Sequence, residues 1–374
     1  LYVYDNVDGS WVFSTKLVAS DLSGDAKLGM NPTTLDVEGD TIIVGAPGET
    51  GWTGSVYVFT RTNGVWEESQ KIVSPFPEPV SSFGIGVSFL GDDLMIGSDF
   101  VDERKGAIYS FVKNTEGVWE YDQTITASNP AVDDFFGNSI SLDEDQLLVG
   151  AYGKNSEVGA AYVFERNDQG TWIETQQLNP NSSSEVSQFG WSTLIEDDFM
   201  VIASPHVYGY EPGEVYTYNK DASGTWVENE IIQGNDTEGE DFYGWSFSLY
   251  NDDLIIGANR EDHDENGENE IFDTGSAYIF ERPAVLGGLS DDAISDVFTV
   301  YPNPTSNFVT ISSKTNSVSK IKLINELGMI LKEETVKATN EYQLDISDLA
   351  QGVYFLNLES QTGEISSKKI IKVE

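Results

Sequence analysis

A repeat of about 53 residues runs through the first three quarters of this 374-residue sequence and constrains its fold more than any other feature. Three markers recur in the same order: a tryptophan after a polar turn, a pair of small residues, and an aromatic residue in a short apolar run. The tryptophans are Trp11, Trp66, Trp119, Trp172 and Trp226, the small pairs are Gly45-Ala46, Gly97-Ser98, Gly150-Ala151, Ala203-Ser204 and Gly257-Ala258, and the aromatic residues are Tyr57, Tyr109, Tyr162, Tyr216 and Tyr278, with an earlier copy at Tyr2. A repeat of this length indicates one supersecondary unit that stacks on its neighbours.

Each repeat has the pattern of four short β-strands. β-Branched and aromatic residues alternate with polar ones, and Gly, Asp and Asn mark the turns. In the third copy the pattern predicts strands at residues 137–142, 146–151, 160–165 and 171–178. One such unit cannot bury both of its faces, so several must pack side by side around an axis. The sequence therefore predicts an all-β fold whose main part is a β-propeller of four-stranded blades.

The markers have structural explanations in such a fold. The small pair at the end of each second strand leaves room where blades converge on a central channel, and the tryptophan offers a large apolar area to the adjoining blade. Acidic turns such as Gly91-Asp92-Asp93 and Glu196-Asp197-Asp198 join the first and second strands, where Asp bonds to nearby backbone. These acidic residues are therefore interpreted as structural.

The starts of the repeats resemble a known family. The copies begin with Phe83-Gly84, Phe136-Gly137, Phe189-Gly190 and Tyr243-Gly244, one second strand keeps Gly45-Ala46-Pro47, and the first copy departs with Leu28-Gly29. These residues resemble the FG-GAP repeat of integrin-α-like propellers. The resemblance covers residues 1–282 and implies a propeller domain over that range.

The repeats contain one strand more than a ring of five blades can hold. First, second and fourth strands occur five times each and third strands six times, which makes 21 strands. The surplus third strand at residues 1–4 competes with residues 278–280 for one place in a blade. We therefore expect sequence upstream of Leu1 and an intact ring of six or seven blades, an expectation that closure of a five-bladed ring by residues 1–20 would contradict.

The composition changes after the last repeat. Residues 283–296 break the rhythm and are interpreted as a linker. Residues 285–374 carry 8 Lys and no Arg against 12 acidic residues, a net charge of −4, whereas residues 1–284 carry 12 basic and 51 acidic residues, a net charge of −39. Residues 297–374 show alternating strands, with Ile321 and Leu323 facing one way and Lys320 and Lys322 the other. Six or seven strands in this range predict a small immunoglobulin-like β-sandwich.

This second domain resembles the type A C-terminal sorting domain of type IX secretion cargo. The resemblance lies in VYPNPTSNFVTI, IKLINELGMIL, LDISDLAQGVYFLNL and the terminal KKIIKVE. It implies export across the outer membrane of a Gram-negative bacterium, with the type IX secretion translocon and a surface sortase as partners. The residues assigned to the sorting signal are Tyr301, Pro302, Asn303, Pro304, Gly352, Tyr354, Lys369 and Lys372.

The sorting-domain motifs also have a purely structural interpretation. The Pro residues fix φ and set an extended entry into the first strand, and Gly352 allows a sharp turn into the strand that follows it. On this interpretation, recognition depends on exposed Lys369 and Lys372 near the end of the chain.

The fifth repeat contains an acidic insertion between its second and third strands. The sequence DHDENGENE has the spacing of a calcium loop, with alternate hard oxygen ligands and Gly267 at the sharp turn. The proposed ligands are Asp262, Asp264, Asn266, the backbone of Glu268, Glu270 and Asp273. Integrin-like propellers usually place such loops between other strands, and a solvated acidic loop is the alternative interpretation.

Composition excludes several classes of function. A net charge of −43 repels phosphate backbones and anionic lipid, so neither nucleic acid nor a membrane surface is an expected partner. The absence of Cys excludes disulfides and thiolate metal sites, and the only histidines are His206 and His263, which leaves little scope for His-activated nucleophiles. No apolar run approaches the roughly 20 residues that cross a bilayer.

These observations favour a secreted or cell-surface, non-enzymatic protein of adhesion type. Its propeller would bind an extracellular protein or glycan through loops on one face. Two alternatives remain open. One is a glycan-cleaving enzyme with paired carboxylates, although no pair among 63 acidic residues can be singled out. The other is a passive structural element of a surface layer.

Overall fold

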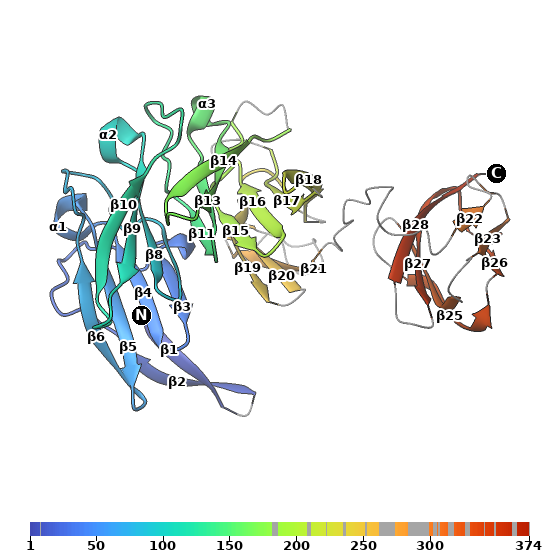
Figure 1. The fold of residues 1–374 in the computed structure, drawn as a ribbon, viewed down its shortest axis with the longest axis horizontal. Helices are drawn as coiled ribbons and strands as arrows, with labels where there is room; N and C mark the ends of the chain where they lie inside the picture. The colour runs from blue at the N-terminus through green and yellow to red at the C-terminus, as the bar shows by residue number, and fades with distance from the viewer. Residues whose placement is uncertain are drawn as a thin grey trace. The chain divides into compact units, whose positions relative to one another are not determined.

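The structure is a computed structural model that divides into two compact units, Leu1–Gly288 and Leu289–Glu374 (Figure 1). It describes residues 1–7, 9–181, 186–207, 211–221, 223–234, 237–250, 253–261, 274–282, 299–301, 305, 307–312, 318–325, 330–339, 341–347, 349–360 and 365–373. Each unit is built from antiparallel sheets.

The first unit contains four complete four-stranded sheets, each formed by consecutive strands. They are β3 Leu35–Glu38, β4 Thr41–Ala46, β5 Ser55–Thr62 and β6 Val65–Ile72; β7 Val87–Leu90, β8 Asp93–Ser98, β9 Ala107–Lys113 and β10 Trp119–Ile125; β11 Ile140–Asp143, β12 Gln146–Ala151, β13 Ala160–Arg166 and β14 Trp172–Leu178; and β15 Thr193–Glu196, β16 Phe199–Ser204, β17 Glu214–Lys220 and β18 Trp226–Ile232. Short helical turns are η1 Pro32–Thr34, α1 Glu49–Trp52, α2 Val101–Arg104 and α3 Lys154–Glu157. Each sheet is one blade, as the repeat predicts.

Two partial sheets flank the four blades. At one end, β1 (Tyr2–Val7) pairs only with β2 (Ser10–Lys16); at the other, β19 (Tyr243–Tyr250), β20 (Asp253–Ala258) and β21 (Ser276–Glu281) form a three-stranded sheet (Figure 1). Among the described residues these make 21 strands, in the order that the period-two pattern predicts. β1 pairs with β2 and not with β21, so residues 1–20 do not complete the last sheet.

Apolar cores lie between successive sheets. Ile43 and Val58 of one blade pack with Phe83, Leu94 and Ile96 of the next, and all five side chains are almost fully buried. Equivalent clusters join each later pair of sheets, and the β1–β2 hairpin packs on β4 and β5 in the same way. A blade therefore buries each face only by means of its neighbours, as a repeat fold requires.

The small residue near the end of the second strand makes room for backbone of the next repeat at Gly45, Gly97 and Gly150. A Cβ atom added to Gly97 would lie 2.0 Å from the carbonyl oxygen of Gly137, in the Phe-Gly turn of the next repeat. That turn is held by a hydrogen bond from Gly137 N to Gly150 O (3.0 Å), and Gly137 has a φ of 90°. Only glycine adopts this φ freely, which explains the Phe-Gly pair.

Hydrogen bonds also join the outer strands of successive blades. The Gln70 side chain accepts from Trp119 N and donates to Trp119 O, both at 2.9 Å, and Gln176 makes the same pair of bonds to Trp226. These tryptophans are buried, as is Trp172, so the expectation that they face the adjoining blade is confirmed for three copies. Trp11 differs, because its side chain is 71% exposed.

The second unit is a small β-sandwich. One sheet has the order β22-β23-β26 and the other β25-β24-β27-β28. The strands are β22 Thr299–Tyr301, β23 Phe308–Ser312, β24 Val318–Asn325, β25 Ile330–Thr339, β26 Glu341–Asp345, β27 Gly352–Ser360 and β28 Ile365–Lys372. Ile321 and Leu323 are buried between the sheets with Leu356 and Ile370, as the alternation in the sequence predicts.

Candidate functional site

An arc of aromatic side chains crosses one face of the first unit. It runs through Phe100, Phe135, Tyr152, Trp191, Trp245 and Phe242, and we call these six residues the aromatic arc. Successive ring centroids lie 5.4, 4.8, 5.0, 4.9 and 5.8 Å apart in that order. The arc therefore spans four consecutive sheets without a break.

The repeat positions explain why these rings share a face. In each antiparallel hairpin the first strand begins where the second strand ends, as Ile140 opposite Val149 shows for β11 and β12. Trp191 and Trp245 lie two residues after the start of a Phe-Gly or Tyr-Gly turn, whereas Phe100 and Tyr152 follow the ends of β8 and β12. All four positions therefore lie at the same end of their sheets, where the first strand begins and the second strand ends.

The rings differ in exposure and in their charged neighbours. Phe100 is 37% exposed and Phe242 is buried, while the other four are partly buried. The Arg104 guanidinium lies over the Phe135 ring at 5.9 Å and pairs with Asp133, and the Arg260 guanidinium lies over Phe242 at 4.6 Å. The arc thus has partly exposed rings along its length and a cation over a ring near each end.

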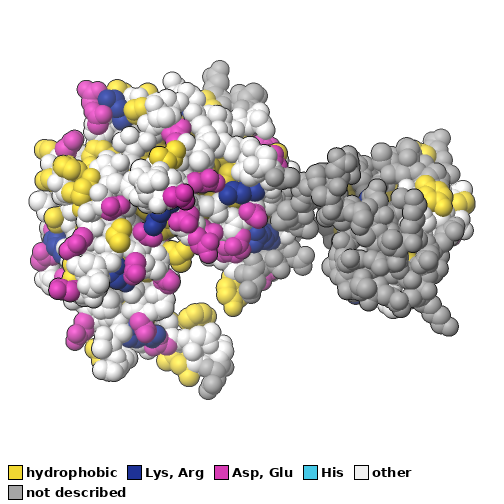
Figure 2. All heavy atoms as spheres, viewed as in Figure 1, with side chains coloured by type: hydrophobic (Ala, Val, Ile, Leu, Met, Phe, Trp, Pro, Cys, Tyr) yellow, Lys and Arg dark blue, Asp and Glu magenta, His cyan; other side chains and the backbone are white. Residues whose placement is uncertain are grey.

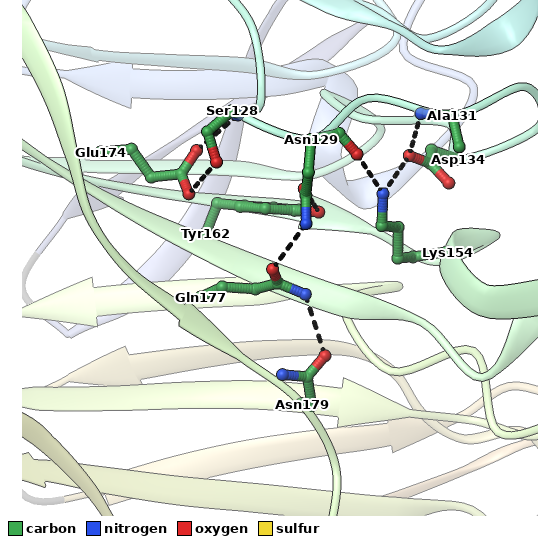
Figure 3. Close-up of polar contacts among 9 residues, drawn as sticks. All are labelled: Ser128, Asn129, Ala131, Asp134, Lys154, Tyr162, Glu174, Gln177 and Asn179. Atoms are coloured by element: carbon green, nitrogen blue, oxygen red, sulfur yellow. Dashed lines mark hydrogen bonds and ion pairs between the residues drawn. The ribbon is translucent and has the colours of Figure 1, made fainter.

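A buried ion pair fixes the middle of the arc (Figure 3). The Lys154 ammonium contacts the Asp134 carboxylate at 2.7 Å, and both side chains are at least nine-tenths buried. Asp134 also accepts from Ala131 N at 2.7 Å, and Lys154 donates to the backbone oxygen of Asn129. Asp134 precedes Phe135 of the arc, so the pair ties the loop that enters β11 to the loop that leaves β12.

Figure 3 also shows how the neighbouring strands join this network. The Tyr162 hydroxyl donates to Asn129 Oδ1 at 2.9 Å, and Asn129 Nδ2 donates to Gln177 Oε1 at 3.0 Å. Burial raises the pKa of Tyr162, which therefore remains a neutral donor at ordinary pH. The loops below the arc are thus held to β13 and β14 as well as to each other.

Asp99 is a buried acid immediately before Phe100 of the arc. Its side chain is 2% exposed, and its Oδ1 atom has no hydrogen-bond partner among the described residues. Burial raises the pKa of Asp99 to about 8. The folded protein therefore holds this carboxyl in its protonated form at neutral pH, whereas the unfolded chain ionises it near pH 4.

We expect Asp99→Asn to stabilise the first unit at pH 8 by on the order of 1–3 kcal/mol relative to wild type. Because the pKa of Asp99 is raised in the folded state, the stability that this carboxyl contributes to the folded state is fully present below about pH 4. That stability is lost as the pH rises to about 8. An asparagine side chain has the shape of the aspartate side chain but does not ionise. Thermal unfolding from pH 4 to 9 should show a wild-type-to-variant gap that widens with pH, and parallel curves would contradict the assignment.

The first strands line a central cavity of about 380 Å³. Its wall includes Ser88, Ser141, Ser192 and Ser248 from four different sheets. Three of these hydroxyls are already used between blades, since Ser88 accepts from Leu142 N at 3.1 Å, Ser141 accepts from Ile195 N at 3.0 Å, and Ser192 donates to Trp245 O at 2.8 Å. The channel wall is therefore engaged in joining blades, and the aromatic arc is the stronger candidate for ligand contact.

The proposed calcium ligands Asp262, Asp264, Asn266, Glu268, Glu270 and Asp273 all lie outside the described residues. Within the described part of the chain, no group of three or more His, Asp or Glu side chains is placed to hold a metal ion. The calcium site remains a prediction from the sequence.

The assigned sorting residues have different environments in the second unit. Tyr301 ends β22 and is 49% exposed, whereas Tyr354 is buried and donates to Ala350 O at 2.9 Å. Lys369 lies in β28 opposite Phe355. Pro302, Asn303 and Pro304 lie outside the described residues.

One expectation about the sorting domain is wrong. Lys372 was expected to be exposed, but it is 9% exposed, and its ammonium donates to Val373 O at 3.0 Å where β28 bridges Thr305. Gly352 begins β27, its φ lies outside the left-handed region, and an added Cβ would meet only the Tyr354 ring, at 3.8 Å, so the sharp turn expected there stays a prediction. Lys372 is buried because the chain end is paired on both sides, which its position in the sequence does not reveal.

The aromatic arc was not predicted from the sequence. Its six members occupy four different repeat positions, and none of these positions carries an aromatic residue in every repeat. One signal was available: Trp191 and Trp245 both follow an aromatic-Gly pair directly, in consecutive repeats. A large ring at that position in two neighbouring blades indicates contact across the blade boundary.

Comparison with known proteins gave matches for both units. The family model of the FG-GAP repeat matches residues 11–59, 119–164 and 226–280, and that of the Secretion system C-terminal sorting domain matches residues 299–373. Integrin alpha-2 of Mus musculus is 31% identical over 147 residues, which are 32% of this chain and 12% of the integrin. The chain thus spans about an eighth of that relative's length.

A solved structure of a protein from Lactobacillus plantarum aligns with the whole chain. The alignment covers 100% of this chain and 92% of the other, with 12% identity and a TM-score of 0.41. No helix in the described part of this chain is both long and apolar enough to cross a membrane.

Proposed function

Because the chain combines FG-GAP repeats with a C-terminal sorting domain of type IX secretion cargo, we propose that it is an exported binding protein of adhesion type. Its propeller binds an extracellular protein or glycan through the face that carries the aromatic arc. The observation that supports this proposal is the arc itself, since five partly exposed or exposed rings gather on one face. Aromatic side chains of this kind dominate the energetics of binding surfaces.

The sorting domain directs the protein to the cell surface or the extracellular space. We propose that the type IX secretion translocon and a surface sortase of a Gram-negative bacterium recognise this domain. The finding that Lys372 is buried moves the proposed recognition surface to exposed positions such as Tyr301.

Calcium is proposed as a structural ion of the fifth repeat. The support is the spacing of oxygen ligands from Asp262 to Glu270 around Gly267. The ion would order the insertion between the second and third strands of this repeat. Those strands are β20 and β21, and β20 ends at the same sheet edge as the arc.

Binding of the immobilised full chain to a panel of matrix proteins and soluble polysaccharides tests the proposal. We expect saturable retention of at least one polymer without release of reducing ends. Release of reducing ends would instead identify a glycan-cleaving enzyme, and self-association with no retained polymer would identify a structural surface-layer protein. Calorimetry with calcium on wild type and on the Asp262→Ala, Asp264→Ala variant tests the ion, since identical flat traces would exclude it.

A further inference from the structure

The aromatic arc has the form of a binding strip for a chain-like ligand. Its six rings stand in single file, and neighbouring centroids are never more than 5.8 Å apart. A protein partner of ordinary affinity needs a broad patch of about 800 Å² on each side. A single file of rings crossing four sheets instead matches an extended polymer that is one residue wide.

The charges around the arc favour a ligand without charge. The repeat region carries a net charge of −39, and Figure 2 shows acidic side chains spread over the visible face of the first unit. A polyanion would be repelled by this field. The same field attracts a cationic segment, but the Arg104 and Arg260 guanidinium groups already occupy the positions over the Phe135 and Phe242 rings where a ligand cation would bind near the two ends of the arc. A neutral polymer is not repelled by the field and does not need those positions.

The chemistry of a neutral sugar chain fits the rings. The face of an aromatic ring carries partial negative charge, and the C–H groups on the apolar face of a pyranose ring carry partial positive charge. Stacking buries both apolar faces while the sugar hydroxyls stay in water. Tyr152, Trp191 and Trp245 are the partly exposed rings in the middle of the arc, where the buried Lys154–Asp134 pair fixes the backbone. Tyr152 and Trp245 each stack one face on a neighbouring ring, Phe135 and Phe242, so a sugar would use the surface of the rings that these contacts leave exposed.

From these observations we propose that the aromatic arc binds a neutral polysaccharide chain laid across four blades. This inference rests on the proposed function and specifies the ligand class of the same face. The central contacts are Tyr152, Trp191 and Trp245. Phe242 is buried and supports Trp245 from below, with its ring nearly parallel at an interplanar angle of 19°.

Affinity electrophoresis of the full chain in gels that contain hydroxyethyl cellulose, xyloglucan or laminarin tests the proposal, with alginate as the anionic comparison. We expect at least one neutral polysaccharide to retard wild type and alginate not to do so. Trp191→Ala and Trp245→Ala should each weaken retardation about tenfold or more, as loss of a central aromatic anchor does. Trp11→Ala is the matched control, because Trp11 is an exposed tryptophan on β2 outside the arc.

Two further measurements separate binding from folding. Trp191→Phe keeps an aromatic ring and should retain most of the binding, and thermal unfolding of each variant reports its stability. In wild type, a neutral polysaccharide should protect tryptophan fluorescence from quenching by acrylamide, which requires no variant. The proposal is overturned if no neutral polysaccharide retards the wild type, or if the arc variants bind as wild type does. Retention of a matrix protein in the earlier panel would then leave the proposed function standing without this ligand class.

Discussion

Gly150→Ala is expected to destabilise the first unit by about 3 kcal/mol or more, since overpacking against backbone cannot relax by a side-chain rotation. An added Cβ would lie 1.9 Å from Gly190 O and 2.3 Å from Ser139 Oγ. The Gly190 carbonyl cannot retreat easily, because it accepts from Ser139 Oγ at 2.8 Å while Gly190 N donates to Ala203 O at 3.0 Å. Differential scanning calorimetry of the full chain should show a lower midpoint for the first unit only.

The same repeat position provides a matched control in the last described sheet. A Cβ added to Gly257 would meet the Ser246 side chain at 2.8 Å and backbone only at 3.6 Å, and no other described residue lies within 4 Å of it. A serine hydroxyl can rotate away, so Gly257→Ala should cost about 1 kcal/mol or less. Equal losses for both variants would show that the close approach between blades is not the cause.

Repeat four shows that this position accepts alanine at another blade boundary. Ala203 occupies it naturally, and a Cβ added to Gly244 in the next turn would still be 3.1 Å from the Ala203 methyl group. The boundary between β16 and β19 therefore holds an alanine, whereas beside Gly150 the Gly190 carbonyl occupies the space that an alanine methyl would need. A loss of stability in Gly150→Ala would therefore reflect the close approach of two particular blades, those that contain β12 and β15.

The blades could be predicted because their signals are local and periodic. A short apolar run between turn residues set β12 at Gln146–Ala151 as expected, and every residue after Gln146 is buried because neighbouring blades cover both faces of the strand. The role of the small pair was only partly predicted. Gly97 needs to be small because of the Gly137 carbonyl in the next repeat, a contact that depends on how two blades meet.

The candidate site was harder to predict because its six residues are spread over four repeat positions, each aromatic in only one or two repeats. Phe135 and Tyr152 stack with an interplanar angle of 8°, yet they lie in different loops and have no counterpart of the same type in most other repeats. Lys154 lies in a polar loop, where a lysine is ordinarily solvated. Only the folded arrangement of the loops brings its ammonium to Asp134, so no pattern in the sequence indicates the pair.

Lys154→Ala is expected to destabilise the first unit by about 3–5 kcal/mol, because removing one partner leaves the other charge buried and uncompensated. The Asp134 carboxylate would keep the Ala131 amide as a donor to Oδ2 but lose its counter-ion. Equilibrium unfolding in urea, read as the change in midpoint at constant slope, measures the loss. The Lys154→Met, Asp134→Leu double variant should recover most of it, since a buried pair is often no better than apolar packing.

The equivalent loop of the preceding blade supplies an exposed pair as a control. Lys105 contacts Asp102 at 2.9 Å, but the Asp102 side chain is 69% exposed, so Lys105→Ala should cost about 1 kcal/mol or less. The two pairs also differ in their link to the arc. Lys154→Ala should weaken retention of any polysaccharide that the arc binds, because Phe135 and Tyr152 lose the contact that fixes their loops, whereas Lys105→Ala should leave retention unchanged. Equal losses of stability and equal retention of polysaccharide in the two variants would contradict both proposed roles of the buried pair, in stabilising the fold and in positioning the arc.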